Sequence, residues 1–352
     1  MGNRDLAVNP PVAFVPAMAR EAAQAADAAV RQVRECAGGF AELGARLRQR
    51  PPSFIVTCAR GSSDHAASYG KYLLETALGR AVASVGPSVA SVYNTPLVLK
   101  DSLFIAVSQS GRSPDLLRLA EAAKAGGAVT VGFVNDEESP LMALCDVALP
   151  LCAGPETSVA ATKSYLLSCL AFLNLTAHWS GSAELLEAVE SVPDALERAV
   201  GLDWWPALET LVPARGLFVI GRGTSYGVAL EMALKFKETS RLHAEAFSAA
   251  EVIHGPLALV GPDLPVLAVG QEDEAAGSIR QAAERIAALG SPVWSALDGA
   301  GTTALPTIAG LHPAVAPLCQ IQSFYMAVHR LAVARGYDPD APANLRKVTE
   351  TR

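Results

Sequence analysis

Short apolar runs alternate with longer stretches of helical character along most of the chain. The runs that we predict to be buried strands span residues 53–59, 103–111 and 129–136. Helices are predicted over 65–78 and 114–127, and the Ala-, Arg- and Glu-rich segment 16–50 is predicted to form one or two more. Apolar strands that alternate with helices are typical of a parallel sheet covered on both faces. We therefore predict an α/β fold.

The strand–turn–helix pattern occurs twice in closely similar form. The segment FIVTCARGSSDHAASYGKYLLE resembles LFVIGRGTSYGVALEMALKFKE, which lies in the second half of the chain. In each copy an apolar run leads through Arg-Gly and two hydroxyl residues into a helix. Such self-similarity predicts two copies of one α/β unit. A helical connector around residues 164–200 would join them.

The two copies differ at a turn where a ligand is expected to bind. In the first copy the strand ends in the neutral hydrogen-bonding residues Ser108, Gln109 and Ser110, and Ser113 precedes the next helix. Ligands of open parallel sheets bind beyond the carboxyl ends of strands, and a helix N-terminus favours an anion. The second copy has two carboxylates in this turn, within residues 270–273, which would repel an anion. The sequence thus predicts one phosphate site per chain, in the N-terminal half.

An alternative for this turn stays open. Ser113 could simply cap the helix that starts at Pro114, because serine is favoured at the N-cap and proline at the first helical position. Nucleotide binding is disfavoured, since neither a Walker lysine nor a GxGxxG motif is present.

The segment from Val228 to Arg241 contains neither glycine nor proline and is predicted to be a helix. Most of its faces are apolar, which is typical of a buried helix. Glu231, Lys235 and Glu238 form one charged stripe at helical spacing. The alternative is a solvated face, but we expect this stripe to face a cleft. A carboxylate beside an amine there could move protons.

Two further residues outside this helix are candidates for the same chemistry. His254 follows the helix within EVIHGP, where Gly255 and Pro256 indicate a loop, and histidine exchanges protons near neutral pH. The other histidines lie in helical or connector contexts and are expected to be structural. Lys347 lies in a proline-broken C-terminal tail and, from its local sequence, would be solvated.

Composition restricts the class of protein. The formal net charge is −7 and no block of Lys or Arg stands out, so we expect no nucleic-acid partner. The cysteines show no CxxC spacing and are expected to be free, mostly buried thiols. The sequence contains neither a signal peptide nor a long unbroken apolar stretch, which predicts a cytoplasmic protein without a membrane span.

Six blocks of the sequence, taken in order, resemble the sugar-isomerase (SIS) family. They are RGSSDHAASYGKYLLE, SQSGRSPD, AGPETSVAATKS, GRGTSYGVALEMALKFKE, HAEAFSAAEVIHGPLALV and DAPANLRKVTE. In particular, the chain is similar to the isomerase half of glutamine–fructose-6-phosphate aminotransferase and to its deaminase relatives, over nearly everything beyond about residue 35.

The resemblance implies two tandem SIS domains, each a parallel sheet flanked by helices in a flavodoxin-like three-layer sandwich. The implied segments are an N-terminal helical segment (1–34), SIS domain 1 with the phosphate site (35–180), SIS domain 2 with the catalytic helix (181–335) and a tail that closes the active site (336–352).

The resemblance also implies residue roles. The phosphate would be bound by Ser108, Gln109, Ser110 and Ser113. The sugar would be contacted by Ser62, Ser63, Val159, Ala160 and Thr162. The catalytic residues implied are Glu238 as the base, Lys235, His254, which promotes ring opening from a neighbouring subunit of a homodimer, and Lys347, which can form a Schiff base.

Three departures from the aminotransferase pattern are expected to affect the reaction. Arg60 replaces a cysteine, and Ala161 replaces a more usual serine. Gly2 follows Met1 where the aminotransferase has the cysteine nucleophile of its glutamine-hydrolysing domain. We therefore expect the reverse direction, in which water releases ammonia from an amino-sugar phosphate.

The predicted reaction converts glucosamine 6-phosphate and water to fructose 6-phosphate and ammonia through an enolamine. It is proton transfer, and neither HxxxH nor CxxC occurs, so no metal and no cofactor is expected. Galactosamine 6-phosphate as substrate, a deglycase, an ammonia-dependent aminotransferase and a plain aldose–ketose isomerase remain alternatives. Outside enzymes, the alternative is a sugar-phosphate-sensing regulator, which would have no need of the four catalytic candidates together.

Overall fold

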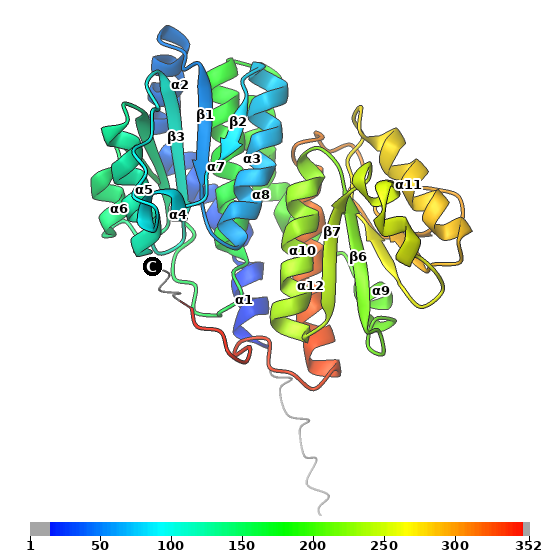
Figure 1. Cartoon of the computed structure of the whole chain (residues 1–352). Helices are drawn as coiled ribbons and strands as arrows, with labels where there is room; N and C mark the ends of the chain where they lie inside the picture. Colours follow the sequence, from blue (N-terminus) through cyan, green and yellow to red (C-terminus); the bar gives the residue numbers. More distant parts are fainter. Residues whose placement is uncertain (1–14, 348–352) are drawn as a thin grey trace, which may run out of the picture.

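A computed structural model describes residues 15–347 of the chain. These residues form two α/β halves that lie side by side (Figure 1). Each half contains a five-stranded sheet in which all neighbouring strands are parallel. The α/β fold predicted from the sequence is confirmed. The first fourteen residues of the expected N-terminal segment and the last five of the expected tail lie outside the described residues.

The two sheets have the same topology, as the internal repeat predicts. The strands of the first sheet are β1 (Phe54–Cys58), β2 (Val82–Ser84), β3 (Ser102–Ser108), β4 (Val129–Val134) and β5 (Val147–Pro150). Those of the second are β6 (Gly216–Gly221), β7 (His243–Ser248), β8 (Val266–Ala268), β9 (Val293–Ser295) and β10 (Thr303–Ala304). The orders are β2-β1-β3-β4-β5 and β7-β6-β8-β9-β10, so both are the flavodoxin-like order 2-1-3-4-5.

Helices cover both faces of each sheet. In the first half they are α1 (Ala17–Ala23), α2 (Ala25–Gln49), α3 (Ser62–Leu78), α4 (Ser88–Ser91), α5 (Pro114–Ala125), α6 (Pro140–Leu144) and α7 (Lys163–Ser180). The following helices are α8 (Ala183–Val200), α9 (Trp205–Glu209), α10 (Thr224–Ser240), α11 (Ala276–Ala288) and α12 (Ala316–Ala334), with two 3-10 helices, η1 (Glu251–His254) and η2 (Pro256–Leu259). The boundary expected between residues 34 and 35 falls inside α2, which runs through it without a break.

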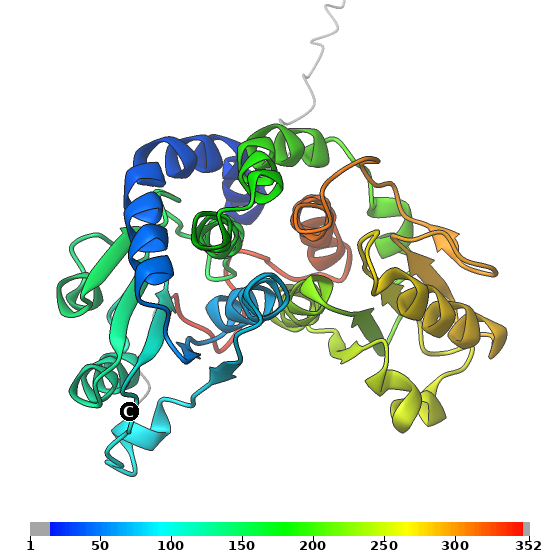
Figure 2. The same cartoon turned by 90° about the horizontal axis from the view of Figure 1, so that it is seen from above.

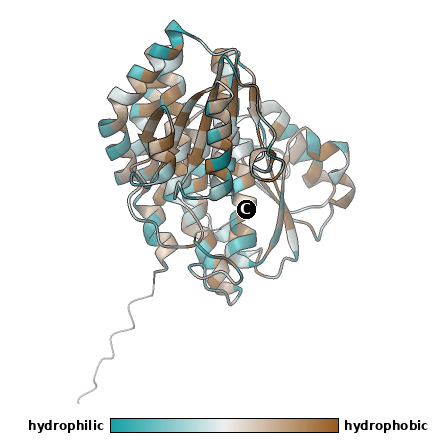
Figure 3. Cartoon of the chain, turned by 60° about the vertical axis from the view of Figure 1, so that its left-hand side comes forward, coloured by the Kyte–Doolittle hydropathy of each residue, from teal (hydrophilic) through white to brown (hydrophobic). Residues whose placement is uncertain are grey.

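The central strands β1, β3, β4, β6 and β8 are apolar because they are buried on both faces. All seven residues of β3 are buried, including its two terminal serines. Figure 3 shows the apolar colour concentrated on these strands, whereas the polar colour lies on the outer helices. This arrangement leaves only the ends of the strands available for contact with a ligand.

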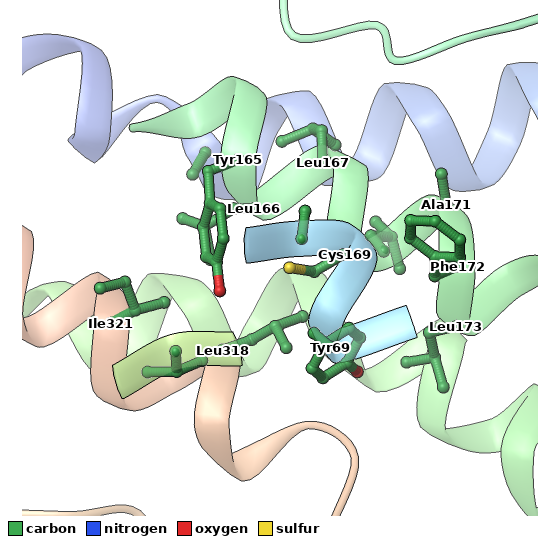
Figure 4. Packing of buried hydrophobic residues seen from close by; sticks show 14 of the residues in the cluster. Tyr69, Tyr165, Leu166, Leu167, Cys169, Ala171, Phe172, Leu173, Leu318 and Ile321 are labelled. Carbon is green, nitrogen blue, oxygen red and sulfur yellow. The ribbon is translucent and has the colours of Figure 1, made fainter. Parts of the chain in front are cut away.

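The centre of the molecule is built around α7, α3 and α10, which lie close together when seen from above (Figure 2). Helix α7, in the expected connector, is buried on almost every residue. Figure 4 shows Tyr165 and Cys169 of α7 packed against Tyr69 of α3 and Leu318 of α12. The connector is therefore part of the core.

Two glycines allow these helices to approach closely. A Cβ atom on Gly227 of α10 would lie 2.6 Å from the backbone nitrogen of Tyr69, and one on Gly70 would lie 2.2 Å from the ring of Phe172. Helix α10 begins at Thr224, before the start at Val228 that was predicted from the sequence, and Gly227 lies in its first turn. A glycine is needed at this position because α3 packs too closely for a side chain.

The chain returns to the first half after α12. Asp340 accepts hydrogen bonds from the backbone nitrogens of Ala17 and Met18, at 2.6 and 2.7 Å, and so caps α1. The red segment in Figure 1 follows this course from α12 toward the first half. Within residues 15–347, no helix combines the length and the apolar composition that a membrane span requires.

Candidate active site

A cavity of about 350 Å³ lies at the carboxyl ends of β1 and β3. These strands are neighbours, and the order 2-1-3 makes their junction the point where the chain changes direction across the sheet. Ligands of open α/β sheets bind at such a switch point. The polar and charged residues of its wall are Arg60, Ser62, Ser63, Ser108, Gln109, Ser110, Ser113, Ser164, Glu238, Arg346 and Lys347.

All four residues of the predicted phosphate site line this cavity. The Oγ atom of Ser108 accepts a hydrogen bond from the backbone nitrogen of Gly111 at 2.9 Å, which closes the turn. Gly111 has a φ of 61°, and a Cβ atom there would lie 2.2 Å from Oγ of Ser139, so only glycine fits. Ser113 occupies the N-cap position of α5 with no capping hydrogen bond from its side chain. Its hydroxyl thus remains available to the cavity.

The two hydroxyl residues that begin α3 form the next part of the wall. Gly61 precedes them with a φ of 56°, which turns the chain sharply out of β1 into the helix. Ser62 donates a hydrogen bond to Oε1 of Glu231 at 3.0 Å, and Ser63 also lines the cavity. The structure thus places Ser62 and Ser63, two of the five residues predicted to contact the sugar, at the cavity.

The charged stripe of α10 lies differently from the prediction. Glu231 and Lys235 have fully buried side chains and do not face the cleft. Only Glu238, with a side chain 18% exposed, lines the cavity. The reason is that α10 packs between α3 and α12, so only its last turn reaches the opening. Lys235 contacts the cavity only indirectly, through an ion pair with Glu238.

Behind Glu238 the buried charges form one network. Glu231 accepts hydrogen bonds from Tyr325 at 3.1 Å and Ser62, pairs with Nδ1 of His65 at 2.9 Å, and lies 3.3 Å from Nζ of Lys235. His65, expected to be structural, is therefore a partner of a buried carboxylate. Isolated buried charges are costly, and this network compensates each of them.

Burial and pairing act in opposite directions on the pKa values of this network. Burial lowers the pKa of the Lys235 ammonium, but the carboxylates of Glu231 and Glu238 outweigh it and raise the pKa. Burial likewise raises the pKa of the Glu231 carboxyl, but Lys235 and His65 outweigh it and lower the pKa. Both Glu231 and Lys235 are therefore charged near neutral pH.

The loop before α7 forms the opposite wall together with the C-terminal tail. Val159 and Ala161 line the cavity, whereas Ala160 and Thr162 are fully buried and do not. Of the predicted sugar-contacting residues in this loop, only Val159 faces the opening, because Ala160 and Thr162 point into the core. Ala161 stands at the wall in place of the serine that is more usual in the family.

Lys347 lines the cavity, rather than being solvated as its local sequence suggests. Its Nζ atom donates to Oε2 of Glu156 at 3.1 Å and to the backbone oxygen of Ser158 at 2.7 Å. Glu156 is buried and also accepts from Ser164, through both Oγ and the backbone nitrogen, and from the backbone nitrogen of Thr162. Burial raises the pKa of Glu156, but Lys347 and these hydrogen bonds outweigh it and lower the pKa.

His254 does not line the cavity of its own chain. It ends the 3-10 helix η1, where a loop was expected, and its side chain is exposed. The structure describes a single chain, so the predicted contribution of His254 to a neighbouring subunit stays a prediction.

The corresponding turn of the second half is folded on itself. The Nε2 atom of Gln271 donates to the backbone oxygen of Arg222 at 3.1 Å and to Oδ2 of Asp273 at 2.8 Å. Glu272 forms an ion pair with Arg280. Two carboxylates thus occupy the position of the hydroxyls of the first half, as the sequence predicts.

Three residues of the site were not assigned roles from the sequence. Glu231 was visible as part of the charged stripe, but its partners outside α10 come from two other helices, α3 and α12. Glu156 lies in one of the six resembling blocks, and a lone carboxylate among small residues was the only signal. Arg60 was noted only as a departure from the family pattern.

Comparisons with known proteins agree with this fold. The family model of the SIS domain matches residues 51–177 and, a second time, residues 210–332. The chain therefore belongs to the SIS-domain family and contains two copies of that domain.

One curated relative is glutamine–fructose-6-phosphate aminotransferase (isomerizing) of Aeropyrum pernix. It is 36% identical over 312 residues, which cover 83% of this chain and 50% of the relative. The chain thus spans about half the length of the curated relatives it matches.

Solved structures show the same fold. A proposed phosphosugar isomerase from Silicibacter pomeroyi has 42% sequence identity and a TM-score of 0.89, covering 93% of this chain and all of that one. Glucosamine-6-phosphate deaminase from Thermotoga maritima has 22% identity and a TM-score of 0.69, covering 92% of this chain and all of that one, which supports the fold alone.

Proposed function

We propose that this chain is an amino-sugar phosphate deaminase that converts glucosamine 6-phosphate and water to fructose 6-phosphate and ammonia. The observation that carries the proposal is one shared cavity. It brings the hydroxyl turn of residues 108–113 together with Glu238, which comes from the other half of the chain. An anion site and a proton-transfer group in one cavity suit a sugar phosphate.

The substrate would be anchored by its phosphate. Ser108, Ser110 and Ser113, with the Gln109 amide, offer neutral donors at the N-terminus of α5, where the helix dipole favours an anion. Ser62 and Ser63 at the start of α3 would contact the sugar hydroxyls. The opened sugar would then extend from the phosphate turn toward Glu238.

Glu238 would act as the base. In the open-chain amino-aldose it removes the proton from C2, and the electron pair forms the C1–C2 double bond of an enolamine as O1 takes up a proton. Glu238 then returns a proton to C1, which leaves an imine at C2. Water adds to this imine and ammonia leaves, so fructose 6-phosphate is formed. A positioned acid–base group of this kind typically contributes ~10²–10⁴-fold to the rate.

The two lysines would act on either side of this proton transfer. Lys235 is buried against Glu238 and would hold that carboxylate in position through their ion pair, so it acts through Glu238 rather than on the sugar. Lys347 stands on the cavity wall and would stabilise negative charge on O1 or form a Schiff base with the ketose. His254 would assist ring opening from a second subunit of a homodimer.

The test is ammonium release from a panel of sugar phosphates. We expect glucosamine 6-phosphate to release ammonium with equimolar fructose 6-phosphate, and galactosamine 6-phosphate or fructosyl-amine phosphates to react more slowly. Absence of ammonium from every hexosamine phosphate would overturn the proposal.

One observation favours a second candidate, the reverse reaction with free ammonia. The curated relative with 36% identity is named an aminotransferase that acts on fructose 6-phosphate. The assay is therefore also run with fructose 6-phosphate and ammonium chloride. Formation of glucosamine 6-phosphate at a rate above deamination would favour this direction.

A further inference from the structure

Arg60 stands on the cavity wall at the carboxyl end of β1, facing the phosphate turn across the switch point. Its Nε and Nη2 atoms both donate to Oδ2 of Asp115, at 3.1 and 2.6 Å. The Asp115 side chain is 1% exposed, whereas that of Arg60 is 51% exposed. The buried carboxylate thus fixes a guanidinium whose other face is open.

Arg60 has donors to spare in this position. A guanidinium carries five N–H groups in one plane, and the contact with Asp115 engages two of them. Within residues 15–347 the other N–H groups of Arg60 form no further hydrogen bond. They are presented to the same cavity as the hydroxyls of Ser110 and Ser113.

Arg60 offsets the charge of Asp115 beside an anion site. Asp115 is the second residue of α5, the helix whose N-terminus follows the phosphate turn. An uncompensated carboxylate there would repel a phosphate dianion. The ion pair cancels that charge, and a guanidinium is suited to donate to phosphate oxygens at the same time.

From this geometry we propose that Arg60 is a phosphate-binding residue, held in orientation by Asp115 and acting beside the hydroxyl turn. The inference rests on the proposed sugar-phosphate site. It gives a role to the arginine that replaces the cysteine of the aminotransferase pattern. Arg60 binds the phosphate, which takes no part in the reaction. It therefore contributes to substrate affinity and not to the proton transfer.

The test is calorimetric binding of glucitol 6-phosphate, an open-chain hexitol phosphate that cannot react. We expect Arg60→Ala to weaken binding by about 10- to 100-fold, the range for losing charge-assisted hydrogen bonds. Arg60→Lys keeps the positive charge but loses the planar set of N–H donors, so its affinity is expected to lie between those of wild type and Arg60→Ala. Lys124→Met is the matched control, because Lys124 also pairs with a carboxylate, Asp146, but lies at the far end of α5.

A second variant separates direct binding from mere neutralisation of Asp115. If Arg60 only cancels that charge, Arg60→Ala combined with Asp115→Asn restores wild-type affinity. If it binds phosphate, the double variant stays at least tenfold weaker than Asp115→Asn alone. Thermal unfolding of each variant identifies any that is unfolded, and Arg60→Lys is then compared with wild type instead.

These binding measurements test the role of Arg60 independently of the proposed deaminase reaction. Affinity within twofold of wild type for folded Arg60→Ala, or restoration by Asp115→Asn, overturns the inference even if ammonium is released. Weakened binding supports it even if glucosamine 6-phosphate proves not to be the substrate. Inorganic phosphate as a competitor of glucitol 6-phosphate is expected to lose potency in Arg60→Ala by a similar factor.

Discussion

Lys347 and Glu156 form an ion pair of 3.1 Å across 191 positions of sequence, and through it the C-terminal tail is attached to the loop that forms one wall of the cavity. The Glu156 carboxylate is fully buried and does not line the cavity. Its function is therefore to position the lysine and the two neighbouring backbone nitrogens that donate to it.

The first prediction concerns this pair. Glu156→Gln and Lys347→Met are each expected to lower the free energy of unfolding by about 1–3 kcal/mol, because each leaves a buried or half-buried partner unsatisfied. Their double variant should cost less than the sum, with a coupling of about 0.5–3 kcal/mol, as found for directly contacting residues. Urea unfolding of the four proteins measures it. Strictly additive losses of stability in the double variant would contradict a direct interaction. The exposed ion pair of Arg198 and Asp194 serves as the control, for which a coupling energy near zero is expected.

The second prediction concerns stability in acid. The pKa of Glu231 is lowered in the folded chain, so its carboxylate stabilises the fold above the ordinary value of 4.5, and this contribution is lost as the pH falls through the lowered pKa. Glu231→Gln should cost about 3–5 kcal/mol at pH 7, since it leaves Lys235 with one carboxylate.

The variant should also lose less stability than wild type between pH 6 and the acid limit. Urea unfolding at a series of pH values measures this, with Glu197→Gln on the exposed face of α8 as the control. Parallel stability curves for wild type and Glu231→Gln would show that the carboxylate is not ionised in the fold.

The third prediction concerns the contact between α3 and α10. Gly227→Ala places a methyl group 2.6 Å from the backbone nitrogen of Tyr69 and is expected to destabilise by about 1–3 kcal/mol through overpacking. Gly38→Ala in α2 has open space around it and should stabilise by about 0.5–1 kcal/mol, the helix preference of alanine over glycine. Thermal unfolding distinguishes them, and the opposite order would contradict the packing described.

The fourth prediction concerns His254, which the single chain leaves exposed. If it completes the site of a partner subunit, two inactive variants, His254→Asn and Glu238→Gln, should restore activity when they are refolded together. Random pairing makes about half of the dimers mixed, and each mixed dimer has one intact site of its two. The mixture should therefore show about one quarter of wild-type activity. No recovery from a verified mixture of dimers would place His254 outside the partner's site.

Much of the fold could be predicted from the sequence because its signals are local. The apolar runs that became β1, β3 and β4 and the helix that became α5 need only hydrophobic periodicity. The glycine-hydroxyl turns recur in both halves, which made the internal repeat visible. The start of α10 was missed because Gly227 was interpreted as a helix boundary, whereas tertiary packing requires it within the helix.

The site was predicted less completely, for a physical reason. The hydroxyl turn and the segment with Glu238 are continuous stretches of sequence that could be singled out locally, and both line the cavity. The depth at which Glu231 and Lys235 lie depends on which helices pack around α10, and no local pattern contains that. The pairing of Lys347 with Glu156 likewise depends on the path of the tail across the molecule.

The most direct test of the account is the separation of binding from turnover in Glu238→Gln. Glucitol 6-phosphate binding and ammonium release from glucosamine 6-phosphate are measured on wild type, Glu238→Gln and the control Glu197→Gln. The account predicts affinity within a few fold of wild type for all three and a loss of turnover of ~10²-fold or more in Glu238→Gln alone. Turnover in Glu238→Gln close to that of the control would contradict the assignment of Glu238 as the group that moves the proton.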